Sequence, residues 1–363
     1  MARCGIELLR EHLKAGTAAP EVWIRFPRLL GDVIFSLPFL GSLQREWNAV
    51  AAELGVKLRW VAVGHAIGAA VFSEADPEFM SESIIESGGL GKPDPWRLLR
   101  RWRRERPVAV INLSQSVRLA LGAWMAGVPI RGGIADNRLN LLYTHPFRYR
   151  DLPIHIVQRY EPLLEKLVGH RKLLWLPVTP ERLGGAGGEA LLRQGGWDGR
   201  PYVTLAFGTR GFNKRWFPEL EKWPALANLI LAEGRAVVWL GGPDERELGA
   251  ELARIVPGSI NLAGATAIPE ACAIQFGAYG NVALDTGLAH TGAATGRPMV
   301  TLIGVSPEQL ISPQGPHALT VRGAALDMAA GEAPGDACGT NSHRIAPRRV
   351  LDLLHLLAME AER

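Results

Sequence analysis

Short apolar segments alternate with helical patterns along the chain, and this alternation constrains the fold more than any other feature. The apolar segments are rich in Val, Ile, Leu and Trp. Strands of a parallel sheet are buried on both faces, and crossover helices connect them. The sequence therefore predicts an α/β protein with parallel sheets. The predicted strands cover residues 22–26, 58–63, 108–113, 202–207, 236–240, 281–284 and 299–303, and the predicted helices cover 33–47, 96–104, 117–125, 155–168, 218–232, 245–255, 269–275 and 288–295.

A stretch rich in glycine and proline interrupts the alternation at residues 177–201, and we place a linker there. A chain of 363 residues is long for one domain, because about 150 residues per domain is the usual size. We therefore expect two doubly wound domains in tandem, at residues 1–177 and 178–345. Open sheets of this type bind ligands at the carboxyl ends of their strands.

The C-terminal segment, residues 346–363, is predicted to form one last helix at 347–361. Its apolar residues fall at positions 350, 353, 354, 357 and 358. This spacing places them on one face of a helix. We expect that face to pack back on the N-terminal domain.

Composition excludes several classes of protein. Hydrophobic residues make up 47% of the chain and charged residues 21%, which is typical of a globular protein. No apolar segment approaches the roughly 20 residues of a membrane-spanning helix, and the charged N-terminus does not fit a signal peptide. The three cysteines, Cys4, Cys272 and Cys338, lack the spacing of a metal or redox site. We therefore expect a cytoplasmic protein.

The two halves of the chain differ in charge. Residues 1–177 hold 24 basic and 17 acidic residues, a net charge of +7, whereas residues 178–363 hold 16 and 19, a net charge of −3. A basic first half favours an anionic partner such as a phosphorylated glycolipid, a membrane surface or nucleic acid. The alternative is a merely solvated surface.

The main basic cluster is WRLLRRWRRER, residues 96–106. Trp96, Leu99 and Trp102 recur at three-residue spacing, so the segment can form an amphipathic helix whose arginines contact lipid phosphates at the inner membrane. The alternative is a solvated helix face. Nucleic acid is not favoured, because aromatic and basic residues do not interleave outside this segment.

The segment VALDTGLAHTGAATGRPMVTLIG, residues 282–304, runs from an apolar strand into a helix of small residues. Asp285, Thr286 and Gly287 stand where the free N–H groups of the helix point outward, and glycine lets a ligand approach the backbone. Such a helix start binds a diphosphate. The alternative is that Asp285 or Thr286 only caps the helix. His290 lies one turn on and either faces the same ligand or packs.

The segment RFPRLLGDVIFSLPFL, residues 25–40, also leads from a strand into a helix. Gly31 permits a tight turn, and Asp32 opens the helix. Asp32 is well placed for a general base, because loops at strand ends line the ligand site. The alternative is a helix cap. Pro38 should kink the helix.

Two further strand ends have the residues of a nucleotide site. FGTRGFNKRWFP, residues 207–218, presents Arg210, Lys214 and Arg215, which suggests an anionic ligand. The alternative is an exposed basic loop. WLGGPDERE, residues 239–247, places carboxylates where a ribose would bind, although acidic residues are also normal in a first helical turn. No GxGxxG follows the first strand and no Walker A sequence occurs, so a nicotinamide enzyme or P-loop kinase is not favoured.

Together and in this order, these segments resemble the ADP-heptose:lipopolysaccharide heptosyltransferase family. The most specific pieces are LLGDVIFSLPFL, KRWFP, LGGPDERE and DTGLAHTGAATGRP, and the resemblance extends from about residue 22 to about residue 316. Residues 123–147 look more like the second heptosyltransferase than the first. The resemblance implies the GT-B fold, in which two Rossmann-like, doubly wound parallel-sheet domains face each other across a cleft.

The resemblance also implies a function and a set of site residues. It implies an inverting glycosyltransferase that transfers heptose from ADP-heptose to the inner core of lipopolysaccharide, an anionic glycolipid acceptor, without a metal. The N-terminal domain would bind the acceptor and the C-terminal domain the nucleotide sugar. The implied residues are Asp32 as base and Lys214 on the leaving diphosphate; Thr209, Arg210, Glu245, Asp285, Thr286, Gly287 and His290 for the donor; and Arg118 and His155 for the acceptor.

Two other classes of function stay open from the residues alone. One is a glycosyltransferase or an epimerase that uses another nucleotide sugar. The other is a non-catalytic module that binds sugar nucleotides. Screening donors that carry different nucleotide bases distinguishes the first alternative from an ADP-heptose transferase. A transfer assay with and without Asp32 distinguishes a catalyst from a binding module.

Overall fold

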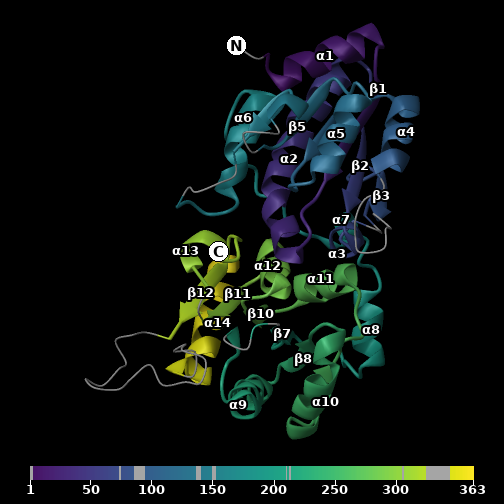
Figure 1. Ribbon diagram of the computed structural model, residues 1–363. Helices are drawn as coiled ribbons and strands as arrows, with labels where there is room; N and C mark the ends of the chain where they lie inside the picture. Colours follow the sequence, from purple (N-terminus) through teal and green to yellow (C-terminus); the bar gives the residue numbers. More distant parts are fainter. Residues whose placement is uncertain are drawn as a thin grey trace. The chain divides into compact units, whose positions relative to one another are not determined.

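A computed structural model describes residues 3–72, 75–85, 95–135, 140–148, 153–209, 211, 214–304, 306–323 and 344–363. The chain divides into two compact units, Met1–Leu176 and Pro177–Arg363 (unit 1 and unit 2). The division falls at the start of the glycine- and proline-rich stretch. Each unit contains one parallel sheet covered by helices on both faces (Figure 1).

The sheet of unit 1 has the strand order β3-β2-β1-β4-β5-β6, with all neighbours parallel. This is the Rossmann order, in which the chain direction across the sheet reverses between β1 and β4. All residues of β4 are buried, which explains why it reads as a continuous apolar segment. The strands are β1 Ala19–Arg25, β2 Arg59–Gly64, β3 Glu82–Ile85, β4 Pro107–Asn112, β5 Ile130–Ile134 and β6 His145–Phe147.

Helices α4 and α5 pack side by side on one face of this sheet, where Leu98, Trp102 and Leu119 join the strand residues Trp23 and Val110 in one buried cluster. Helices α1, α2 and α6 pack on one another, and α2 continues through Pro38. The helices of unit 1 are α1 Gly5–Ala15, α2 Leu30–Glu53, α3 Ala66–Ala70, α4 Pro95–Glu105, α5 Val117–Met125 and α6 Glu161–Val168, with short 3-10 helices at Asn140–Leu142 and Gln158–Tyr160.

Unit 2 repeats the same topology, with the order β12-β11-β10-β7-β8-β9 and the reversal between β7 and β10. Every residue of β7, β8, β10 and β11 is buried, and all four strands were predicted from the sequence. The strands are β7 Tyr202–Ala206, β8 Ala236–Leu240, β9 Ile260–Asn261, β10 Gly280–Leu284, β11 Met299–Ile303 and β12 Ala318–Arg322.

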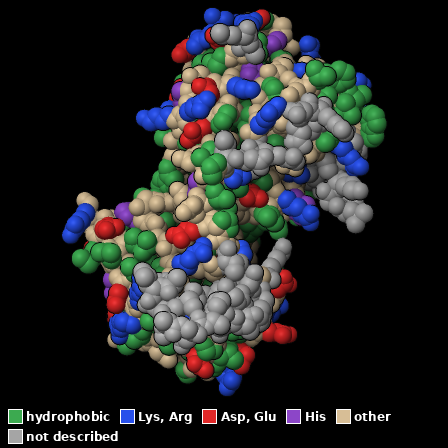
Figure 2. Space-filling model, turned by 60° about the vertical axis from the view of Figure 1, so that its left-hand side comes forward, with side chains coloured by type: hydrophobic (Ala, Val, Ile, Leu, Met, Phe, Trp, Pro, Cys, Tyr) green, Lys and Arg blue, Asp and Glu red, His purple; other side chains and the backbone are tan. Residues whose placement is uncertain are grey.

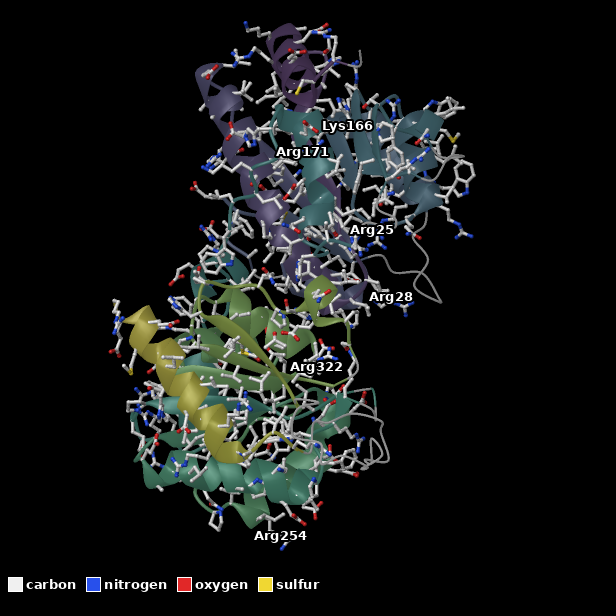
Figure 3. All side chains as sticks on the ribbon, turned by 90° about the vertical axis from the view of Figure 1, so that its left-hand side faces the viewer. Arg25, Arg28, Lys166, Arg171, Arg254 and Arg322 are labelled. Atoms are coloured by element: carbon white, nitrogen blue, oxygen red, sulfur yellow. The ribbon has the colours of Figure 1, made fainter. Side chains whose placement is uncertain are left out.

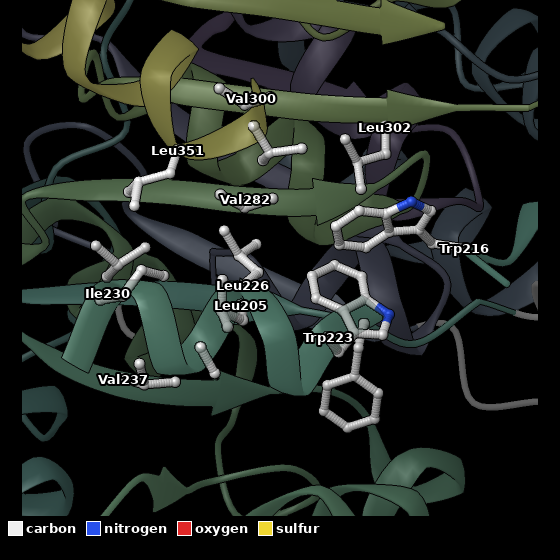
Figure 4. Packing of buried hydrophobic residues seen from close by; sticks show 14 of the residues in the cluster. Leu205, Trp216, Trp223, Leu226, Ile230, Val237, Val282, Val300, Leu302 and Leu351 are labelled. Atoms are coloured by element: carbon white, nitrogen blue, oxygen red, sulfur yellow. The ribbon is translucent and has the colours of Figure 1, made fainter. Parts of the chain in front are cut away.

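One face of the second sheet carries a core of large side chains (Figure 4). Trp216 and Trp223 meet edge to face with ring centroids 5.1 Å apart, and both are fully buried. The helices of unit 2 are α7 Pro180–Leu183, α8 Gly188–Gln194, α9 Glu219–Ala232, α10 Arg246–Ile255, α11 Ile268–Gly277, α12 Gly287–Ala294, α13 Glu308–Ile311 and α14 Pro347–Ala361, with a 3-10 helix at Pro243–Glu245.

The C-terminal helix α14 packs on α9, β10 and β11, and it belongs to unit 2. The expectation that it packs back on the N-terminal domain is therefore wrong. Its apolar face completes the core of the second sheet, where Leu351 and Leu354 are fully buried. The fit is close, because a Cβ atom added at Gly280 would lie 2.7 Å from Leu354 Cδ1. The sequence predicted the helix and its apolar face correctly, but periodicity does not identify the surface that the face covers.

Leu354→Ala should destabilise unit 2 by about 2–5 kcal/mol, because it leaves a cavity between α14 and the sheet. Leu356→Ala is the matched control on the same helix, since Leu356 is 49% exposed. We expect its effect to stay within about 0.5 kcal/mol. Urea denaturation followed by tryptophan fluorescence measures both. Equal effects of the two substitutions would contradict the packing of α14.

Candidate active site

The carboxyl ends of the strands of unit 2 bring together four loops, which follow β7, β8, β10 and β11. Strands β7 and β10 are neighbours and run in the same direction, so their loops leave the sheet at one edge. The chain reverses its direction across the sheet between these two strands, and open α/β sheets bind ligands at that point. The loops after β7, β8 and β10, together with the start of the helix after β10, hold most of the donor-binding residues expected from the sequence.

Lys214 and Asp285 form the central contact of this edge. Lys214 Nζ lies 2.8 Å from Asp285 Oδ2, and the Asp285 side chain is only 3% exposed whereas that of Lys214 is 31% exposed. The Ser306 hydroxyl donates to the same Oδ2 atom. Lysine and serine therefore fix the carboxylate from two sides. The ammonium group, in turn, is anchored by this ion pair, and the lysine side chain is partly exposed.

Arg322 supports this contact from the end of β12. Its Nη2 atom donates to the Ser306 carbonyl oxygen at 2.6 Å, and its Nε atom lies 3.9 Å from Glu308 Oε2 (Figure 3). The arginine thereby holds the loop that carries Ser306. Neither Ser306 nor Arg322 was predicted from the sequence. Ser306 follows a predicted strand and was available to the strand-end argument, but β12, which positions Arg322, was not predicted.

Helix α12 begins directly beside Asp285. Thr286 occupies the N-cap position, but its side chain makes no capping hydrogen bond. The Asp285 carboxylate is also used elsewhere, by Lys214 and Ser306. Neither Asp285 nor Thr286 therefore caps helix α12 with its side chain, so the capping interpretation is wrong. The first N–H groups of a helix have no partners within the helix, so the start of α12 suits an anion. His290, one turn on, is 7% exposed and packs into the unit.

Glu245 reaches back from the β8 loop to the end of β7. Its Oε2 atom accepts a hydrogen bond from the Gly242 N–H at 2.7 Å. A Cβ atom at Gly208 would lie 2.1 Å from Glu245 Cγ, so only glycine lets this side chain lie against the β7 loop. Beside it, Thr209 Oγ1 accepts from the Gly211 N–H at 3.3 Å. Arg210 lies outside the described residues.

Asp32 stands at the corresponding edge of unit 1, in the first turn of α2. The N-cap position is occupied by Leu29, so Asp32 is not the capping residue. Burial raises the pKa of the Asp32 carboxyl above its ordinary value. Among the described residues, its carboxylate has no hydrogen-bond or ion-pair partner. A half-buried carboxylate with a raised pKa is suited to accept a proton.

The two residues expected near the acceptor lie at different places in unit 1. His155 packs edge to face on Phe35, with ring centroids 5.3 Å apart, and Phe35 lies one turn from Asp32 on α2. The structure thus brings His155 close to the Asp32 turn. Arg118 is exposed on the first turn of α5, the helix that follows β4. Because β4 pairs with β1, both helices begin at the same edge of the sheet.

Two arginines, Arg25 and Arg28, also lie at this edge of unit 1. The sequence analysis gave them no role. Arg25 ends β1 and is 7% exposed, and it donates to the Phe26 carbonyl oxygen. Arg28 is exposed in the turn before α2 (Figure 3). Both lie within the segment that contains Asp32. Arginine at a strand end is an ordinary finding, so the sequence alone gave no reason to single them out.

The described residues contain no group of three or more His, Cys, Asp or Glu side chains that could hold a metal ion. The expectation of a metal-free reaction stays a prediction. Within the same residues, no helix is long and apolar enough to cross a membrane.

Two Rossmann-like sheets in tandem, with a helix start and a lysine at the carboxyl edge of the second, match the GT-B fold class of glycosyltransferases. The family model described as glycosyltransferase family 9 (heptosyltransferase) matches residues 95–332. The chain belongs to this family, as the resemblance predicted. Its GT-B fold is confirmed as well.

Relatives of both subtypes are similar to the chain. Lipopolysaccharide heptosyltransferase 2 of Salmonella typhimurium is 27% identical over 304 residues, which are 79% of this chain and 84% of that protein. Lipopolysaccharide heptosyltransferase 1 of Pseudomonas aeruginosa is 27% identical over 297 residues, 76% of each chain. The structure of Escherichia coli ADP-heptose lps heptosyltransferase II has a TM-score of 0.73 at 23% identity and covers 94% of this chain and 100% of its own. The predicted likeness to the second enzyme therefore stays a prediction.

Gly208→Ala should weaken ADP binding at least about tenfold, because the new methyl group displaces the Glu245 carboxylate. A double-mutant cycle with Glu245→Ala tests the cause. If displacement of Glu245 is the whole effect, adding Gly208→Ala to Glu245→Ala weakens binding no further. Isothermal titration calorimetry measures all four proteins. Additive losses would show that Gly208 acts independently of Glu245.

Proposed function

We propose that the protein transfers heptose from ADP-heptose to an inner-core lipopolysaccharide acceptor, with inversion at the anomeric carbon. The observation that supports this most is the Lys214–Asp285 contact at the start of α12. It combines a cation, a helix start and a glycine at one strand end, which suits the diphosphate of a sugar nucleotide. Membership of the heptosyltransferase family supports heptose as the sugar.

The donor would bind with its diphosphate at the first N–H groups of α12 and at Lys214. Glu245 would accept hydrogen bonds from the ribose hydroxyls, and Thr209 and Arg210 would contact the phosphates. As the bond between the sugar and the diphosphate breaks, negative charge grows on the leaving ADP. Fixed cations and N–H groups aimed at that charge are often the largest contribution to catalysis. Ser306 and Arg322 act as positioning residues, because Ser306 holds Asp285, which in turn holds Lys214, and Arg322 holds the backbone of Ser306.

Asp32 would serve as the general base in unit 1. An acceptor hydroxyl oxygen attacks the anomeric carbon, its proton passes to the Asp32 carboxylate, and the bond from the anomeric carbon to the diphosphate oxygen breaks. The attack comes from the face opposite the leaving group, which inverts the configuration. His155, Arg118, Arg25 and Arg28 supply positive charge or hydrogen bonds for a phosphorylated acceptor.

Asp32→Asn should lower kcat by about 10² to 10⁴ while ADP binding is unchanged, because the amide cannot accept the proton. A transfer assay with ADP-heptose and a calorimetric titration with ADP, UDP and GDP measure the two properties. A variant that loses ADP binding but still turns over would contradict the assignment. A wild-type protein that binds UDP or GDP in preference to ADP would instead favour another nucleotide-sugar enzyme.

The pH dependence follows from the same residue. The pKa of Asp32 is raised by burial, so transfer should fall as the pH drops through a value above that of an ordinary aspartate. The stability of the folded protein depends on pH in the opposite direction. The protonated Asp32 carboxyl favours the folded state, and this contribution is lost as the pH rises through the pKa of Asp32 in the folded protein. Asp32→Asn should therefore melt at the same or a higher temperature than the wild type at neutral pH. A lower melting temperature would indicate a structural role.

A further inference from the structure

Helix α5 exposes an apolar stripe, formed by Val117, Leu121, Trp124 and Met125. These side chains are 49%, 42%, 51% and 37% exposed, respectively. Their spacing places them on one face of the helix, opposite the face whose residue Leu119 packs on the sheet. Single exposed hydrophobic residues are common, but a contiguous group indicates an interaction surface.

Helix α4 lies beside α5 (Figure 1), and its sequence is rich in arginine. Both helices cross from the carboxyl edge of the sheet to its amino edge, so they are parallel. At the far end, Arg103 Nη2 lies 3.4 Å from the Met125 carbonyl oxygen. Trp96, at the start of α4, is 61% exposed. Figure 2 shows hydrophobic side chains gathered near the upper right of the view, with Lys and Arg side chains close to them.

Residues 96–106 were predicted to form an amphipathic helix with Trp96, Leu99 and Trp102 at three-residue spacing, and the structure has a helix there. Its apolar face packs inward, because Leu99 is 4% and Trp102 is 1% exposed. Trp102 packs edge to face on Trp23, with ring centroids 5.7 Å apart. The apolar residues of α4 other than Trp96 thus belong to the core. The apolar part of the surface comes from α5, and α4 contributes the charge.

The charge of this surface is only partly balanced. Arg101 pairs with Glu82 and Glu105, and Arg104 pairs with Glu105. No carboxylate of the described residues lies within ion-pair distance of the exposed Arg97, Arg100 or Arg103. The α5 stripe contains Trp124, and the neighbouring helix α4 carries the exposed Trp96 and these arginines. Exposed apolar and tryptophan side chains beside arginines match the interface of a bilayer with anionic headgroups.

We propose that the α4/α5 surface, made of Trp96, Arg97, Arg100, Arg103 and the α5 stripe, docks on an anionic phospholipid bilayer. The apolar side chains enter the headgroup region and the arginines contact lipid phosphates. The start of α5 lies at the same sheet edge as the Asp32 turn. A lipid-anchored acceptor would therefore reach that edge from the bilayer. The surface itself does not depend on which sugar is transferred.

Vesicle flotation of the full chain tests the proposal, with phosphatidylcholine alone or mixed with phosphatidylglycerol. The wild type should bind the anionic vesicles, less at high salt. Leu121→Glu/Trp124→Glu should lower the bound fraction at least tenfold, and Arg97→Glu/Arg100→Glu should remove the preference for anionic lipid. All variants should keep the wild-type affinity for ADP, which shows that they are folded.

Matched controls lie on unit 2. Leu356→Glu/Met359→Glu changes two hydrophobic residues that are 49% and 55% exposed, and Arg254→Glu/Arg349→Glu makes the same charge change as the arginine variant. Both should bind vesicles like the wild type. Equal loss in the controls, or no vesicle binding by the wild type, would overturn the proposal. It would also be overturned if gel filtration showed that Trp124→Glu separates a dimer into monomers without any lipid binding, since the surface would then join two copies.

Discussion

The site depends on one buried carboxylate, Asp285, and on the lysine that it holds. A carboxylate that is 3% exposed requires compensation, and Lys214 and Ser306 provide it at the same oxygen atom. The ion pair fixes the ammonium group beside the first turn of α12, where the helix presents its free N–H groups. Under the proposed function, the anchored ammonium group and the helix start would both act on the diphosphate of the donor from fixed positions.

The topology of unit 2 makes this contact possible. Lys214 and Asp285 are far apart in sequence, but they follow β7 and β10, which pair at the point where the chain reverses its direction across the sheet. Unit 1 uses the same order and places Asp32 after β1, the strand that corresponds to β7. The raised pKa of Asp32 and the compensated charge of Asp285 show how one topology yields two carboxylates with different surroundings.

Strands buried on both faces were predictable, because β7, β8, β10 and β11 consist of continuous apolar segments. Strands β3, β5, β6, β9 and β12 were not predicted from the sequence. Strand β5 contains two glycines, β9 has two residues, and β12 is only partly buried, so their signals are weak. Predicted site residues such as Glu245 do lie after the ends of strands, but the role of Gly208 in making room for Glu245 was not predicted. Ser306, Arg322 and the partner of α14 depend on contacts between distant segments, which periodicity does not encode.

The central claim is that Lys214, anchored by Asp285, binds the terminal phosphate of the nucleotide. The most direct test compares the affinities of ADP and AMP by calorimetry in the wild type and in Lys214→Ala. The wild type should prefer ADP by about tenfold or more, as expected for one charge-assisted contact, and the variant should bind both nucleotides nearly equally. An undiminished preference for ADP in Lys214→Ala would contradict the account.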